Sequence, residues 1–290
     1  MAAFAKGGLF LIMPSFIAER LSIGTFYNPH LAEALLAQGD LVDHLSMADP
    51  PAADDALFPR IRERFPLLLH DYLGQLADPL SDHALARSRR LQELYQGPWI
   101  AEHFQCLHTE DGKYTLDYVF PPLYTEDFLR RFVANAQRLA DFVGAPLVME
   151  NIPGFFSVEH AQMSEAEFLR RFFEESGCGF LIDVPHLWLA AHYRRRNPRE
   201  YIGEFPLDKV IEIHVGGIED DRDLGGPWVA PTRPTREILE LGVWIAERAP
   251  ALRAVTVDQF SPALTADVML ESVQMTGEAF GASSAVRKTA

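Results

Sequence analysis

Short apolar runs alternate with segments of helical periodicity along most of the chain. In the segment 125–143, for example, Phe128, Phe132, Ala136 and Leu139 recur at helical spacing and define one apolar face. Eight runs have the length and composition of buried strands, nearly all of them separated by helical segments: 21–26, 41–47, 66–70, 99–103, 148–153, 181–186, 210–217 and 254–260. This alternation predicts a parallel (β/α)8 barrel, the TIM-barrel fold of the α/β class.

The fifth and sixth runs show the expected strand–helix–strand unit most clearly. Ser164 and Glu167 form a candidate capping box at the start of the helix between them. Gly177-Cys-Gly179 would end that helix, because glycine tolerates the positive φ of a helix C-terminus. No internal repeat or domain linker interrupts the chain, so we expect residues 1–290 to form a single TIM-barrel domain with its core at about residues 20–280.

Three connecting segments have features of their own. The long connection at residues 104–124 is a candidate loop over an active site, because long loops in compact domains are commonly functional. The acidic segment 219–223 follows the seventh run and reads as a loop. The arginines at 194–196 are expected to form a solvated face, since a short charge run is a weak signal for phosphate binding.

Composition and charge exclude several classes of function. The formal net charge of −15 opposes binding to nucleic acid and to anionic membrane surfaces, since both need a basic face. No apolar run approaches the ~20 residues of a membrane span, and the apolar patch at residues 9–13 is too short for a secretory signal. There are 2 cysteines and no Cys-x-x-Cys pair, so we expect a cytoplasmic protein without a zinc ribbon or thioredoxin-like motif.

Polar side chains gather where the predicted strands end. Active sites of TIM barrels lie at the carboxyl ends of the strands, so these side chains would share one mouth. Six consecutive runs contribute imidazoles, carboxylates or amides: His70, Glu102, His103, Glu150, Asn151, Asp183, His186, Glu212, His214, Asp258 and Gln259. Carboxylates buried together repel one another, and a bound cation removes that cost. Histidine mixed with carboxylate favours iron, manganese or zinc over magnesium or calcium.

Other interpretations of these residues explain less. A single histidine is often a hydrogen-bonded core residue, which is our expectation for His30, His44, His83, His108, His160 and His192. Glu212 could face the helix layer while His214 packs inside the barrel. A glycosidase pair such as Glu102 with Glu150 would leave the strand-end histidines unexplained. The sequence contains no Gly-x-Ser-x-Gly elbow, no phosphate loop and no Gly-x-Gly-x-x-Gly fingerprint of a dinucleotide-binding open sheet.

Several motifs together resemble one known family. They are, in order, Pro66-Leu-Leu-Leu-His70, Ala101-Glu-His103, Glu150-Asn-Ile-Pro153, Leu181-Ile-Asp-Val184, Glu212-Ile-His214 and Ala254-Val-Thr-Val-Asp258. In this order and spacing the chain resembles the multinuclear non-heme iron-dependent oxidative enzymes, the family of the methanobactin biosynthesis oxidase. The resemblance implies a barrel, two or three iron ions and dioxygen as oxidant. It also implies, as the usual substrate, a cysteine of a ribosomal peptide, sometimes delivered by a partner protein.

The resemblance also implies roles for particular residues. It places metal ligands at His70, His103, Glu150, Asp183, His214 and Asp258. The chain departs from the family's usual pattern in four ways: Val184-Pro-His186 replaces Val-Asn-Asn, Ile218 and Gly225 each replace a histidine, and Asp258 replaces a glutamate. We therefore expect one to three iron ions, two being favoured, with His186 recruited as a metal residue. Asp183, His186 and Asn151 are the candidate catalytic residues, and the last two would act as further ligands or orient the ligands.

Three functions follow as hypotheses. The first is a non-heme iron-dependent, dioxygen-using enzyme that oxidises a cysteine or other residue of a ribosomal peptide, or a small thiol, in natural-product maturation. A partner protein could deliver the peptide. The second is a sugar-isomerase-like or hydrolase barrel that uses zinc or manganese without redox chemistry. The third is a catalytically inactive barrel that acts as a binding subunit, which the missing histidines motivate.

Overall fold

Eight parallel strands close into a barrel in the order β1-β12-β9-β8-β7-β4-β3-β2. The computed structural model describes residues 20–48, 50–52, 54–70, 76–108, 115–154, 161–223 and 225–282. The barrel strands are β1 (Ser22–Phe26), β2 (His44–Met47), β3 (Leu67–His70), β4 (Ile100–His103), β7 (Leu147–Glu150), β8 (Gly179–Asp183), β9 (Val210–Val215) and β12 (Ala254–Val257). Each predicted run supplies one strand, so the TIM-barrel prediction is confirmed.

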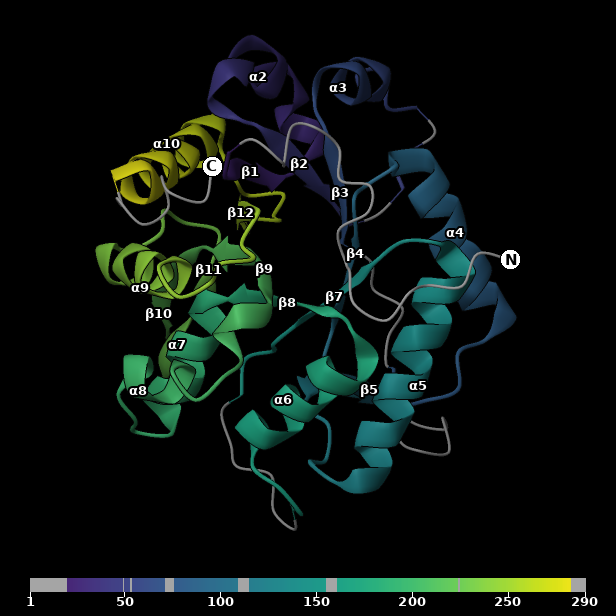
Figure 1. Cartoon of the computed structure of the whole chain (residues 1–290). Coiled ribbons are helices and arrows are strands. Elements are labelled where there is room, and N and C mark those ends of the chain that lie inside the picture. Colours follow the sequence, from purple (N-terminus) through teal and green to yellow (C-terminus); the bar gives the residue numbers. More distant parts are fainter. Residues whose placement is uncertain are drawn as a thin grey trace.

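Helices surround the strands on the outside of the barrel (Figure 1). They are α2 (Ala32–Ala37), α3 (Phe58–Arg64), α4 (Asp82–Tyr95), α5 (Glu126–Val143), α6 (Glu165–Ser176), α7 (Val184–Tyr193), α8 (Pro198–Ile202), α9 (Arg236–Ala246) and α10 (Ala266–Ala282), with short 3-10 turns at Pro29–Leu31, Gly39–Leu41 and Leu207–Lys209. The ends of α6 agree with the sequence signals. The Ser164 hydroxyl accepts a hydrogen bond from the Glu167 amide at 3.1 Å, and Gly177 ends the helix at φ 74°.

Apolar residues form two layers, one outside the strands and one within the barrel. The outer layer includes phenylalanines of α5 and α6, such as Phe172, whose ring centroid lies 4.8 Å from that of Phe104 in an edge-to-face contact. The inner layer is Leu68, Trp99, Ala101, Val148, Leu181, Ile211 and Ala254. Four of these residues precede His70, His103, Glu150 and Asp183 by two positions, and therefore share their face of the strand. The inner layer is thus an apolar floor below the polar residues.

Two antiparallel hairpins lie in connections that the sequence pattern predicts to be loops. β5 (Cys106–His108) pairs with β6 (Thr115–Phe120) inside the connection at residues 104–124. β10 (Gly217–Asp221) pairs with β11 (Gly226–Ala230), so the acidic segment is part of a hairpin. The last barrel strand ends at Val257, earlier than predicted. Among the described residues, we find no helix with both the length and the apolar character needed to cross a membrane.

Candidate metal centre

Imidazoles and carboxylates from neighbouring strands meet at one end of the barrel. His70, His103, Glu150 and Asp183 are each the last residue of their strand, as the parallel-barrel argument requires. The cluster consists of the seven predicted metal residues: His70, His103, Glu150, Asp183, His186, His214 and Asp258. The structure therefore brings the predicted residues together, and their roles stay predictions.

Glu150 lies at the centre of this cluster and is buried. Its Oε2 atom is 3.2 Å from His70 Nε2, 3.3 Å from His103 Nε2 and 3.8 Å from His214 Nδ1. Its other oxygen, Oε1, is 3.4 Å from His186 Nδ1. One carboxylate thus faces imidazoles from β3, β4, β9 and α7, which is the position of a ligand that several ions could share.

Glu212 and His214 both face the barrel interior, because they lie two positions apart in β9, and a bulge just before them lets Ile211 face inward too. Along β8 the pairing shifts from Phe180 with Val210 to Leu181 with Glu212, which leaves Ile211 as an extra residue in β9. Ile211 belongs to the apolar floor, and the shift lets the next inward positions be Glu212 and His214. The alternative that Glu212 faces the helix layer is therefore wrong.

Asn151 locks the end of β8 in place. Its amide nitrogen donates to the Asp183 carbonyl at 3.1 Å, and its amide oxygen accepts from the Asp183 backbone N–H at 3.0 Å. The Asp183 carboxylate in turn caps α7 by accepting from the His186 amide at 2.6 Å. The His186 ring places Nδ1 3.1 Å from the Asn151 carbonyl oxygen, which only accepts, so Nδ1 carries a proton. Among the two roles considered for Asn151, this geometry favours orienting a ligand.

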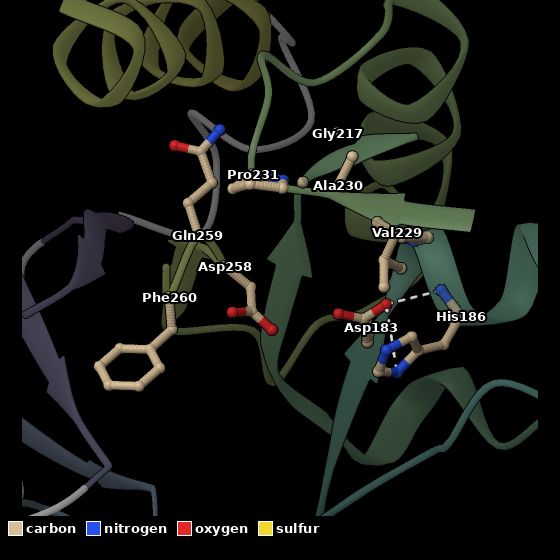
Figure 2. A pocket seen from close by; sticks show the side chains of 11 residues that line it. Asp183, His186, Gly217, Val229, Ala230, Pro231, Asp258, Gln259 and Phe260 are labelled. Atoms are coloured by element: carbon tan, nitrogen blue, oxygen red, sulfur yellow. Dashed lines mark hydrogen bonds and ion pairs between the residues drawn. The ribbon is translucent and has the colours of Figure 1, made fainter. Parts of the chain in front are cut away.

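A cavity of about 190 Å³ opens beside the cluster. Asp183, His186 and Asp258 line its polar side, and Val229 and Phe260 belong to its apolar side. Figure 2 shows the Asp258 carboxylate directed into the space beside the Asp183 and His186 pair, with the β11 residues along the same space.

Two further residues complete the rim of this cavity. Phe260 is 55% exposed, which is unusual for a large apolar side chain and leaves its ring available for contact. Gln259 is turned away from Asp258 (Figure 2), and its amide nitrogen donates to Ser272 Oγ at 3.1 Å and to the Thr232 carbonyl. Gln259 thus shapes the rim, although the sequence pattern placed it at the site.

Burial keeps three histidines of the barrel interior neutral. It lowers the pKa of His70 and of His103 to about 3 each. It lowers the pKa of His44, which lies further down the barrel, to about 4. The first two are therefore neutral imidazoles near neutral pH, which is the form in which histidine binds a metal.

Three other groups of the cluster, His186, His214 and Asp183, hold their protons more tightly than usual. Burial disfavours a charged His186, but the carboxylates of Asp183 and Glu150 outweigh this and raise its pKa to about 9. In the same way Glu150 and Asp258 outweigh burial and hold the pKa of His214 well above its usual range. Burial raises the pKa of the Asp183 carboxyl to about 7. In the absence of a metal ion, these bound protons offset the negative charge of the buried carboxylates.

The residues fit a bound metal ion. Glu150 Oε2 and His214 Nδ1 are buried and make no hydrogen bond within the described part of the chain. Three trios each offer ligand atoms within 4.8 Å of one another: His70, Glu150 and His214; Glu150, Asp183 and His186; Asp183, His214 and Asp258. Mixed nitrogen and oxygen donors of this kind suit iron, manganese and zinc. The trios share Glu150, Asp183 and His214, and the expected number of one to three ions stays a prediction.

Two other sequence expectations need correction. Glu102 lies beside Met149 in the register while His103 lies beside Glu150, so Glu102 points to the other face of β4 and cannot pair with Glu150 as a glycosidase would. The arginine run is only partly a solvated face, because Arg194 is largely buried and ion-paired with Glu165.

The histidines assigned to the core divide into three groups. His44 is hydrogen-bonded within the barrel, as expected. His30, His83 and His192 are exposed, so the expectation of a core position is wrong for them; His30 contacts the Leu264 carbonyl oxygen at 2.9 Å, and the ring of His192 stacks on Trp188. His160 and the side chain of His108 lie outside the described residues.

The barrel and its buried cluster define an enzyme-type TIM barrel with a candidate metal site. The family model described as "RiPP precursor modification enzyme MbnB/TglH/ChrH" matches residues 40–227, and the chain belongs to this family of enzymes that modify ribosomal peptides. The predicted family resemblance is thereby confirmed. The match includes six of the seven cluster residues, and Asp258 lies beyond it.

Relatives and solved structures agree with this assignment at different levels. A UPF0276 protein of Rhizobium meliloti is 28% identical over 213 residues, which are 73% of this chain and 64% of the relative. A UPF0276 protein of Bordetella pertussis is 33% identical over 168 residues, 57% of each chain. The chain thus matches less than two thirds of the length of these two relatives.

Solved structures show the fold alone. A xylose isomerase-like TIM barrel protein of Mycobacterium smegmatis in complex with magnesium has a TM-score of 0.60 at 14% identity and covers 93% of this chain and 99% of its own. Endonuclease IV of Thermus thermophilus has a TM-score of 0.56 at 13% identity and covers 90% of this chain and 100% of its own.

Proposed function

We propose that the protein is a non-heme iron-dependent enzyme that uses dioxygen to oxidise a residue, in the first place a cysteine, of a ribosomal peptide. The observation that carries the proposal is the buried Glu150 carboxylate with imidazoles within 3.2 to 3.8 Å of its two oxygens. Membership of a family of peptide-modifying enzymes supports the substrate class. A partner protein that delivers the peptide is part of the proposal.

The residues of the site would have different roles in this reaction. His70, His103, Glu150, Asp183, His214 and Asp258 would hold one to three iron ions, with His186 as a further ligand. When bound, iron would supply a binding site for the thiolate and would carry electrons from this substrate, which is oxidised, to dioxygen, which is reduced. Asn151 keeps Asp183 directed at the cluster through two hydrogen bonds. The cavity of about 190 Å³ has room for a single side chain, and its apolar side could contact the apolar part of that side chain.

A glutamate substitution tests the proposal. Glu150→Gln should remove most of the bound iron and abolish oxygen uptake with a cysteine-containing peptide encoded beside the protein. Glu165→Gln is the control, because Glu165 is a partly buried, ion-paired glutamate of α6 outside the cluster. Iron content and oxygen uptake that survive Glu150→Gln would refute the proposal, as would an equal loss of both in Glu165→Gln.

The same donor atoms also favour a second candidate function. Solved structures of similar fold include a D-allulose 3-epimerase of Methylomonas sp., with a TM-score of 0.57 at 15% identity and coverage of 90% of this chain and 98% of its own. A zinc or manganese isomerase or hydrolase would use the cluster to activate a hydroxyl group or water without redox chemistry. Turnover of a sugar without oxygen consumption would favour this function.

A further inference from the structure

Glu212 lies directly below His214 in the barrel and ends a buried chain of hydrogen bonds. Its Oε1 atom is 3.3 Å from His214 Nε2. The same atom accepts from the Thr256 hydroxyl at 2.6 Å, and Oε2 accepts from the Trp99 indole N–H at 2.8 Å. Glu212 is only 1% exposed, so hydrogen bonds from these donors replace the hydrogen bonds that its carboxylate would make with water.

This chain of hydrogen bonds continues away from the cluster, and its donors and acceptors can be assigned in only one order. The Thr256 hydroxyl donates to Glu212, so its oxygen accepts from His44 Nε2, 2.9 Å away. Nδ1 of the neutral His44 ring then accepts from the Ser22 hydroxyl at 2.8 Å. Every donor in the chain therefore points toward Glu212, which is consistent only with an ionised carboxylate at that end.

Two features of the backbone make room for these hydrogen-bonded side chains. A Cβ atom at Gly24 would lie 2.3 Å from the His44 carbonyl oxygen and 2.5 Å from its ring. The bulge in β9 lets Glu212 face inward directly after the inward Ile211. Both features serve a polar group in the middle of a barrel that an apolar side chain would otherwise fill.

The geometry points to Glu212 as a positioning residue that holds the His214 ring so that its Nδ1 lone pair is presented to the metal. Nδ1 lies 3.8 Å from Glu150 Oε2 and 3.7 Å from Asp258 Oδ2, on the side of the ring opposite the Glu212 contact. A carboxylate that accepts from one ring nitrogen leaves the other nitrogen free of its proton in the metal-bound state. This inference rests on the metal site of the proposed function and extends it to a residue below that site.

A glutamine at this position would act in a defined way. Trp99 N–H requires an acceptor, so the amide oxygen of Glu212→Gln would face Trp99 and the amide nitrogen would face His214 Nε2. A donor at that place favours the opposite tautomer, with the proton on Nδ1, where the metal must bind. Adding Trp99→Phe removes the donor that holds the amide in this orientation. The double variant should therefore recover part of the lost affinity, although it removes a second native hydrogen bond.

The experiment measures Zn²⁺ affinity by competition with a chromogenic chelator, together with the histidine tautomers of the zinc-loaded protein by ¹⁵N NMR. Glu212→Gln should weaken binding about ten- to hundred-fold, and Glu212→Gln with Trp99→Phe should recover part of this. Ser22→Ala is the matched control, because it breaks the same chain at its far end and should leave the affinity within about twofold.

The outcomes separate this inference from the proposed function. If the unaltered protein binds neither Zn²⁺ nor Fe²⁺, the metal site itself fails. If it binds metal and Glu212→Gln binds equally well with an unchanged His214 tautomer, the positioning role alone is overturned. The positioning role is also overturned if Ser22→Ala weakens binding as much as Glu212→Gln, since the effect would then come from a loosened barrel interior.

Discussion

Metal binding should release protons from the cluster, in a number that the structure predicts. In the metal-free protein His186 has a pKa of about 9 and His214 a pKa well above its usual range, so both are protonated near neutral pH. Each of these two imidazolium rings must lose one proton before one of its ring nitrogens can bind a metal. Asp183, with a pKa of about 7, adds a further fraction of a proton. His70 and His103 add none, because their pKa values of about 3 leave them neutral.

The expected release is thus about two protons per fully loaded chain near neutral pH. Removing one proton at pH 7 from a group of pKa 9 costs two pH units, or about 2.7 kcal/mol. Because these pKa values are raised, the competing protons are held at low pH and lost as the pH rises. Metal affinity should therefore increase as the pH rises through the Asp183 pKa of about 7 toward the His186 pKa of about 9.

Anaerobic calorimetry with Fe²⁺ in two buffers of different ionisation enthalpy measures the released protons. His186→Gln should lower the release by about one proton. The control is His192→Gln, since His192 is an exposed histidine on the same helix. A release below about half a proton, or an equal release from His186→Gln and the unaltered protein, would refute the reasoning on charge in the cluster.

Three further substitutions test the packing around the site. Asn151→Leu leaves the Asp183 backbone N–H and carbonyl without their partners and should cost about 2–4 kcal/mol in the free energy of unfolding, with weaker metal binding by competition assay. Phe172→Ala should cost about 3–5 kcal/mol in urea unfolding, because Phe172 is fully buried, with metal binding retained in the folded protein; a loss under about 1 kcal/mol would contradict the packing. Gly24→Ala should lower the melting temperature by several degrees, since its Cβ would overlap His44; an unchanged melting temperature would contradict the close approach.

The barrel was predictable because each strand carries its own signal. Runs such as residues 66–70 and 148–150 are apolar until a polar residue ends the strand, and capped helices lie between most of them. The two hairpins outside the barrel lacked such signals. β10 is Gly-Ile-Glu-Asp-Asp, whose residues mostly disfavour strands, and its pairing with β11 overrides that local preference.

The site was predictable residue by residue but not in its geometry. Each of His70, His103 and Glu150 ends a predicted strand. The carboxyl ends of parallel barrel strands meet at one end of the barrel, so the sequence alone predicts that these residues lie together. The inward position of Ile211 directly before the inward Glu212 depends on a one-residue bulge, which no local pattern in β9 marks. The burial of Arg194 depends likewise on Glu165, 29 residues earlier in the chain. Both features are tertiary, so a single sequence could not supply them.

Iron content measured beside oxygen uptake tests the central claim most directly. The protein would be purified anaerobically, reconstituted with Fe²⁺, desalted and analysed for metal per chain, and then exposed to air with its visible spectrum recorded. The account predicts about two iron ions per chain and an oxygen-dependent absorption band, since the shared trios of ligands accommodate more than one ion. Retention of zinc or manganese with rejection of iron, or no metal at all, would contradict it.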